Sequence, residues 1–238
     1  MSGLVVIGTD TGAGKTVVAA GIAGIFKKTN ISVGVMKPVA TGGIRLNARL
    51  VSPDALFLSA AATVPFEPEL VNPYCYELPV VPVVAARGHE PINLDVIKER
   101  FGILQHRYDI VVVEGVGGLL VPLSDELMLP DLIWALNLPV LIVARANLGT
   151  INHTLLTIQR ARAAGLEVLG FVMNRVGNKG VVEQTSPSII SRFADAPCLG
   201  KVEEGTGIDV DSCSLGNTVE IVERGLDWGR LLQMIRAT

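Results

Sequence analysis

The chain has 238 residues, of which 49% are hydrophobic and 18% charged, and its formal net charge at pH 7 is -3. This length and composition suit one sizeable domain with a buried core and disfavour a disordered or filamentous chain. The small negative charge offers no basic field for nucleic acid, and no apolar run reaches membrane-spanning length. The three cysteines lie far apart and predict neither a disulfide framework nor a zinc site. The N-terminus lacks the pattern of a signal peptide, so we expect a cytoplasmic location and no membrane partner.

A short apolar run, Leu4–Ile7, leads directly into the sequence Gly-Thr-Asp-Thr-Gly-Ala-Gly-Lys-Thr at residues 8–16. A strand followed by a glycine-rich turn that ends in Gly-Lys-Thr predicts a phosphate-binding loop. Backbone N–H groups and the start of the following helix then face the phosphate oxygens. We expect Lys15 to reach the β- and γ-phosphates and the Thr16 hydroxyl to coordinate Mg²⁺. Five residues separate Gly8 from Gly14, whereas the common form of the motif has four.

Further along the chain, helical patterns alternate with apolar strands. We predict helices over residues 15–28, from residue 53, over residues 93–106 and around residues 155–161, and strands over residues 32–36, 110–113, 139–144, 168–173 and 198–202. Residues 37–43 are expected to form a loop, and the proline-rich residues 65–91 an extended excursion rather than a second domain. Continuous apolar strands joined by helices indicate a mostly parallel sheet with helices on both faces. The predicted fold class is therefore α/β, in a single domain over residues 1–238.

Polar residues follow the predicted strands, at the edge where open parallel sheets bind their ligands. Lys37 follows one strand, where an ammonium group suits phosphoryl transfer, although an exposed loop lysine fits equally well. Glu114 follows four apolar residues, and a carboxylate buried there favours a metal or a lysine as its partner. Asp54 after Pro53 has the pattern of a helix N-cap. Asn174 fits either a turn or a contact with the edge of adenine.

Together these motifs resemble the dethiobiotin synthetase family of P-loop nucleoside triphosphatases. The resemblance spans about residues 4–176 and rests on six motifs in the same order. They are Gly8-Thr-Asp-Thr-x-x-Gly-Lys-Thr16 with its five-residue spacing, Lys37-Pro-Val-Ala-Thr-Gly42, Asp54-Ala55, Asn72-Pro-Tyr74, Val113-Glu-Gly-Val-Gly-Gly118 with Val121-Pro-Leu123, and Leu148-Gly-Thr-Ile-Asn-His153.

The resemblance implies a homodimer that converts 7,8-diaminopelargonate, CO₂ and ATP into dethiobiotin, ADP and phosphate with the help of Mg²⁺. In this reaction one amine captures CO₂ as a carbamate, the γ-phosphate is transferred to the carbamate, and the second amine expels phosphate. Catalytic roles fall to Thr11, Lys15 and Lys37, and the metal ligands are Thr16, Asp54 and Glu114. The residues implied to contact the nucleotide are Gly12, Ala13, Gly14, Lys15, Thr16, Val17, Glu114, Gly117 and Asn174. Those implied to contact the other substrate are Thr11, Lys37 and Thr41, with Leu148, Gly149 and Asn152 contributed across the dimer.

Two departures from the family pattern stand out. Gly12 occupies a position where many members carry an acidic residue, so any role of that side chain is absent. Residues 199–203 lack the proline that usually ends the strand near the adenine, so Glu203 is either a replacement contact or has no such role.

Two other functions fit parts of the pattern. A corrinoid amide synthetase has a similar fold but normally carries a second domain, for which there is no room after residue 180. A nucleotide switch of the chromosome-partition and septum-positioning class typically has a second lysine early in the loop, where this chain has Thr9, Asp10 and Thr11. That class often ends in a basic membrane-binding helix, whereas residues 226–238 hold only two arginines and are expected to pack.

Overall fold

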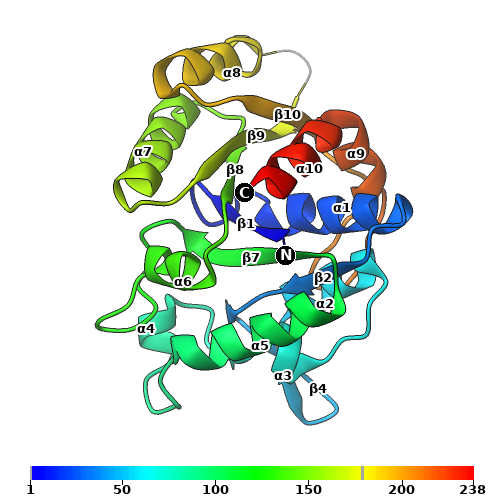
Figure 1. Ribbon diagram of the computed structural model, residues 1–238, viewed down its shortest axis with the longest axis vertical. Coiled ribbons are helices and arrows are strands. Elements are labelled where there is room, and N and C mark those ends of the chain that lie inside the picture. Colours follow the sequence, from blue (N-terminus) through cyan, green and yellow to red (C-terminus); the bar gives the residue numbers. More distant parts are fainter. Residues whose placement is uncertain (1, 178–179) are drawn as a thin grey trace.

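The computed structural model describes residues 2–177 and 180–238, which are built around a six-stranded sheet (Figure 1). The strand order is β10-β9-β8-β1-β7-β2, and every neighbouring pair is parallel. The strands are β1 (Ser2–Gly8), β2 (Val33–Met36), β7 (Ile110–Gly118), β8 (Val140–Arg145), β9 (Val168–Val176) and β10 (Cys198–Glu203). The predicted parallel α/β architecture is confirmed.

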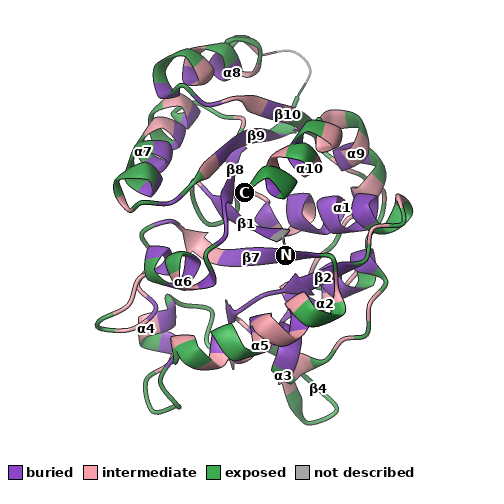
Figure 2. Ribbon diagram, viewed as in Figure 1, coloured by how far each residue is buried: buried purple, intermediate pink, exposed green. Residues whose placement is uncertain are grey.

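Helices cover both faces of this sheet. One face carries α1 (Lys15–Lys28), α2 (Pro53–Ala62), α9 (Thr218–Gly225) and α10 (Trp228–Ala237), and the other carries α5 (Leu94–Arg107), α6 (Leu129–Leu136), α7 (Thr150–Ala163) and α8 (Val181–Ala194). The alternation of side chains along β1 feeds both cores, because Leu4 and Val6 face one core while Val5 and Ile7 face the other. Figure 2 shows the central strands as almost continuously buried, which explains their unbroken apolar sequences.

The proline-rich excursion contains short elements of its own. These are α3 (Pro68–Val71), β6 (Tyr74–Tyr76) and α4 (Pro82–Ala85). Strand β6 pairs in parallel with β3 (Val39–Thr41), and an antiparallel hairpin, β4 (Ile44–Leu46) with β5 (Arg49–Val51), follows β3. The expectation that all of residues 37–43 form a loop is therefore wrong for residues 39–41. Those residues become a strand because a partner from more than thirty positions away satisfies their backbone groups.

The C-terminal helix α10 packs against β1, β9 and β10 in the same core as α1 (Figure 1). Leu231 and Ile235 of α10 are fully buried, while Trp228 and Leu232 are partly buried against the same core. The interpretation of the apolar residues after 226 as packing residues is therefore confirmed. Within the described part of the chain, no helix combines the length and apolar character required to span a membrane.

Candidate functional site

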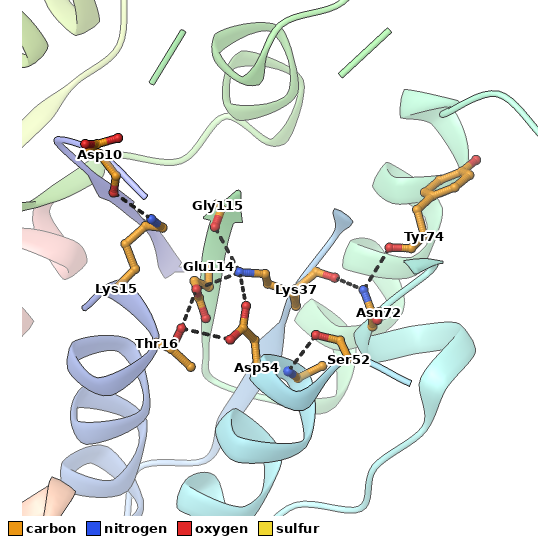
Figure 3. A network of polar contacts seen from close by, with 11 residues as sticks. Asp10, Lys15, Thr16, Lys37, Ser52, Asp54, Asn72, Tyr74, Glu114 and Gly115 are labelled. Atoms are coloured by element: carbon orange, nitrogen blue, oxygen red, sulfur yellow. Dashed lines mark hydrogen bonds and ion pairs between the residues drawn. The ribbon is translucent and has the colours of Figure 1, made fainter. Parts of the chain in front are cut away.

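The glycine-rich loop joins the end of β1 to the start of α1 at the carboxyl edge of the sheet (Figure 3). Gly14 is the residue before the helix and has a φ of 88°, a conformation that favours glycine. A Cβ atom at this position would also overlap the side-chain amide of Asn174. The Lys15 ammonium lies across the loop, where Nζ donates to the main-chain oxygen of Asp10 at 3.2 Å. The loop and the start of α1 thus present the phosphate-binding arrangement that the sequence predicts.

Asn174 supports this loop from the neighbouring part of the sheet. It lies within β9 rather than in a turn, and only 3% of it is exposed. Its Nδ2 donates to the main-chain oxygen of Ala13 at 2.9 Å. The interpretation of Asn174 as a turn residue is therefore wrong, whereas its contact with adenine stays a prediction.

Lys37 and Glu114 come together because their strands are neighbours in register. Met36 of β2 pairs with Val113 of β7, so the next residue of each strand lies at the same level of the sheet. Lys37 Nζ lies 2.7 Å from Glu114 Oε1 and 3.2 Å from the main-chain oxygen of Gly115. Their side chains are 4% and 1% exposed respectively. Lys37 is thus a buried ion-pair partner and not an exposed loop lysine.

Asp54 reaches the same ammonium from the first turn of α2. Its Oδ2 lies 2.8 Å from Lys37 Nζ. The N-cap of α2 is Ser52, whose Oγ accepts from the Ala55 N–H at 3.3 Å, so the N-cap interpretation of Asp54 is wrong. The serine takes over the capping role and leaves the Asp54 carboxylate available to the site.

Thr16 completes the cluster from the first turn of α1. Its hydroxyl oxygen lies 2.9 Å from Glu114 Oε1 and 3.2 Å from Asp54 Oδ1. The three residues expected to bind the metal, Thr16, Asp54 and Glu114, therefore converge around Lys37 (Figure 3). We call these four residues the ion cluster.

Burial and neighbouring charges raise the pKa of some groups in and beside the ion cluster and lower the pKa of others. Burial disfavours the charge of Lys37, but attraction to Asp54 and Glu114 outweighs burial and raises the pKa of Lys37. Burial also disfavours the charge of Asp54, yet the nearby ammonium of Lys37 lowers the pKa of that carboxyl. Burial raises the pKa of Glu114 against the attraction of Lys37. For Lys15, burial and repulsion by Lys37 lower the pKa.

The donor atoms of the ion cluster suit a hard divalent cation. Glu114 Oε2 is buried without a hydrogen-bond partner, which leaves one carboxylate oxygen available as a ligand. The described residues hold no group of three or more His, Cys, Asp or Glu side chains placed to bind a metal ion. A cation at the cluster would therefore depend on two carboxylates, a hydroxyl and oxygens from a phosphate, which is the manner in which proteins bind Mg²⁺.

The remaining predicted residues belong to the loop, the start of α1, β3 and β7. The Thr11 hydroxyl approaches Gly117, since a Cβ built on that glycine would lie 3.6 Å from Thr11 Oγ1. Ala13 is buried and Val17 partly buried at the start of α1, and Thr41 ends β3. Gly12 has a φ of 77°, and no atom lies within 4 Å of the position that its Cβ would occupy.

The segment predicted to meet the substrate from the other subunit lies on the surface. Leu148 is 88% exposed, and Gly149 and Asn152 are exposed at the start of α7. None of the hydrogen bonds or ion pairs found among the described residues links these three to the ion cluster. Leu148, Gly149 and Asn152 are therefore not gathered into the same site within one chain.

Sequence reasoning missed the supporting roles of Ser52 and Asn72. A serine directly before proline is a frequent start signal of helices, and this signal identifies Ser52 as a candidate cap. Asn72 was visible only as part of the Asn-Pro-Tyr motif, and no local pattern indicates that its amide contacts Lys37 O at 2.6 Å.

The parallel sheet, the glycine-rich loop and the ion cluster define a P-loop nucleoside triphosphatase. Consistent with this class, residues 2–210 match the AAA domain family. The chain is 40% identical over 202 residues to the ATP-dependent dethiobiotin synthetase BioD of Bacillus licheniformis, covering 84% of this chain and 85% of that protein. It is 36% identical over 220 residues to the corresponding protein of Thermodesulfovibrio yellowstonii, covering 88% and 92%. The chain belongs to the dethiobiotin synthetase family, and the resemblance derived from its motifs is confirmed.

Solved structures with a similar fold include cell division proteins. The MinD cell division protein of Aquifex aeolicus has a TM-score of 0.62 at 13% identity, with 98% of each chain covered. The cell division ATPase MinD of Pyrococcus furiosus has a TM-score of 0.57 at 19% identity, with 98% of this chain and 100% of that chain covered. At such low identity the likeness concerns the fold alone, so it does not favour the nucleotide-switch alternative.

The close approach of Gly14 to Asn174 leads to a prediction about nucleotide binding. Gly14→Ala should weaken ATP binding about 10- to 100-fold, because the left-handed backbone and the overlap with Asn174 both distort the loop. Isothermal titration calorimetry with ATP measures this change. Gly165→Ala is the control, since it shares the positive φ, meets open space and lies outside the predicted nucleotide contacts, and its effect should be clearly smaller. Equal losses in the two variants would contradict the role assigned to the contact with Asn174.

Proposed function

We propose that this protein catalyses the ATP-dependent carboxylation and ring closure of 7,8-diaminopelargonate to dethiobiotin. Membership of the dethiobiotin synthetase family supports the overall reaction. The observation that carries the proposal is the ammonium of Lys37, buried between two carboxylates beside the phosphate loop. A buried cation held at this point suits a reaction in which negative charge develops near the γ-phosphate.

The proposed reaction has three steps. One amine of the substrate attacks CO₂ and loses a proton, which forms a carbamate. A carbamate oxygen then attacks the γ-phosphorus of ATP, so that a new P–O bond forms while the bond to the β-phosphate oxygen breaks and ADP leaves. The second amine attacks the carbon of this mixed anhydride and loses a proton, and the C–O bond to phosphate breaks. The products are the ureido ring, ADP and inorganic phosphate.

Lys15 and Lys37 supply the positive charge that these reaction steps need. A carbamate is a weak nucleophile and approaches another anion, so cations on both sides lower the repulsion. Lys15 is positioned across the phosphate loop, and Lys37 is held next to Thr16. Thr11 and Thr41 are proposed to hydrogen-bond the amine or carbamate end of the substrate. The other loop residues, Gly12, Ala13, Gly14 and Val17, together with Gly117 and Asn174, are proposed to contact the nucleotide.

Mg²⁺ is proposed as the metal, held by Thr16, Asp54 and Glu114. Their oxygen atoms match its preference for hard ligands, and the unpartnered Glu114 Oε2 provides a free donor. When bound with ATP, Mg²⁺ neutralises phosphate charge during the transfer.

A homodimer is proposed to complete the substrate site. Leu148, Gly149 and Asn152 are exposed and separate from the ion cluster, which fits residues that act on the site of a second subunit. Their proposed role is to bind the carboxylate end of the substrate. We further propose a cytoplasmic location, where ATP is available, and cell fractionation with a specific antibody tests it.

The proposed reaction can be tested directly. Purified protein supplied with 7,8-diaminopelargonate, bicarbonate, ATP and Mg²⁺ should form dethiobiotin, detected by mass spectrometry, with about one ADP released per product because one γ-phosphate is transferred per ring closed. Omitting the diamine is the control and should suppress most ADP release. ATP turnover that ignores the diamine, with no product formed, would exclude the proposed function.

Lys37 lies between two of the proposed metal ligands, Asp54 and Glu114. We therefore predict how Mg²⁺ changes the stability of the protein in the absence of nucleotide. Lys37→Met leaves Asp54 and Glu114 facing each other without their cation, so unfolding should become easier by about 3–5 kcal/mol. Millimolar Mg²⁺ should restore part of the lost stability in this variant and change the wild type little, as measured by thermal melting. Lys28→Met removes the exposed pair with Glu223 and serves as the control, with a small loss and no Mg²⁺ response. An equal Mg²⁺ response in all three proteins would argue against these ligands.

Subunit mixing tests the proposed dimer. Lys37→Met removes the cation of the ion cluster, and Asn152→Asp sets a carboxylate against that of the substrate, so each variant alone should have very low activity. Because a mixed dimer has one site with both residues intact, random mixing of the two should recover about a quarter of wild-type activity. Analytical ultracentrifugation establishes that dimers form and exchange. Exchanged dimers that stay inactive would show that both residues act within one subunit.

A further inference from the structure

We propose that Asn72 is a positioning residue that fixes Lys37 for the phosphoryl-transfer step, an inference that rests on the proposed function. Asn72 lies just after α3 in the proline-rich excursion, and only 5% of it is exposed. Its Nδ2 lies 2.6 Å from the main-chain oxygen of Lys37 and 3.1 Å from that of Tyr74. Both partners are carbonyl oxygens, which only accept hydrogen bonds, so the group facing them must be the amide NH₂.

Main-chain bonds hold the two peptide groups that flank the Lys37–Pro38 peptide. The Lys37 N–H donates to Val71 O at 2.7 Å, and the Tyr74 N–H donates to Pro38 O at 3.2 Å. Residues 71–74 therefore bind the backbone on both sides of the Lys37–Pro38 peptide, and the amide of Asn72 binds the Lys37 carbonyl oxygen between these contacts (Figure 3). The parallel pairing of Val39 with Tyr74 extends the contacts into β3 and β6. The excursion thereby contributes to the site through main-chain contacts and the neutral amide of Asn72.

The consequence for catalysis follows from the position of the ammonium group. Lys37 Nζ is held by three oxygen atoms, from Asp54, Glu114 and Gly115, at distances of 2.8, 2.7 and 3.2 Å respectively. Its side chain can satisfy all three only while its own backbone stays in place. Without the Asn72 amide, the Lys37 carbonyl oxygen loses its hydrogen bond, and the backbone of Lys37 can shift on that side. Small misplacements of a charged catalytic group reduce rates strongly, which is why positioning residues affect turnover more than substrate binding.

The test compares Asn72→Ala with Asn93→Ala. Asn93 is an exposed asparagine whose Oδ1 accepts from the Asp95 N–H at the start of α5, and no hydrogen bond found among the described residues links it to Lys37. Asn72→Ala should lower kcat about 10- to 100-fold with KM for ATP changed less than about threefold, whereas Asn93→Ala should leave kcat nearly unchanged. In a Lys37→Gln background, Asn72→Ala should cause little further loss, since both changes remove the same contribution. Independent, additive losses in this double-mutant cycle would overturn the proposal.

A second readout does not depend on turnover. Brief treatment with acetic anhydride, followed by peptide mass spectrometry, reports how accessible each lysine is. In folded Asn72→Ala the labelling of Lys37 relative to Lys28 should rise several-fold over wild type, because the ammonium loses its fixed partners. If labelling rises but the wild type forms no dethiobiotin, the proposed function fails while the positioning role stands. If product forms and labelling of Lys37 does not change, the positioning role fails alone.

Should Asn72→Ala not fold, Asn72→Ser replaces it in both measurements, because serine keeps a donor in a smaller side chain. It should give a milder loss of kcat and a milder rise in labelling in the same directions. Wild-type values for both quantities in folded Asn72→Ser would overturn the proposal.

Discussion

The buried ammonium of Lys37 is the feature on which the rest of the site depends. Two carboxylates brought this close would repel each other, and Glu114 is almost fully buried. Lys37 compensates this repulsion and joins three separate parts of the chain, which are the end of β2, the first turn of α2 and the end of the apolar part of β7. Thr16 ties the same cluster to the phosphate loop. Charge balance at the carboxyl edge of the sheet thus fixes the position of the site proposed for phosphate chemistry.

Two buried asparagine side chains outside the ion cluster fix the backbone around the site. Asn174 supports the phosphate loop from β9, and Asn72 supports the backbone of Lys37 from the excursion. Both are buried amides that bind main-chain oxygens, so each fixes a backbone position without adding charge. A site that handles several anions at once benefits from such neutral supports, because every additional buried charge shifts the pKa of the lysines.

The comparison with MinD separates what the fold provides from what the site provides. MinD structures share the sheet and its helices over nearly the whole chain, yet sequence identity is below 20%. The dethiobiotin synthetases of Bacillus licheniformis and Thermodesulfovibrio yellowstonii share 40% and 36% identity with this chain. A common fold therefore supports proteins with different functions.

Local backbone preferences and short motifs were enough to predict the strand–loop–helix unit at residues 4–28, the apolar parallel strands and the family. The sequence also singled out Lys37, Glu114 and Thr16. The packing of distant segments decided that residues 39–41 form a strand and that Asn72 and Asn174 support the backbone. Lys37 and Glu114 are 77 residues apart, and their contact depends on the register of two strands. Such contacts arise from the packing of distant segments, for which no local pattern in the sequence is diagnostic.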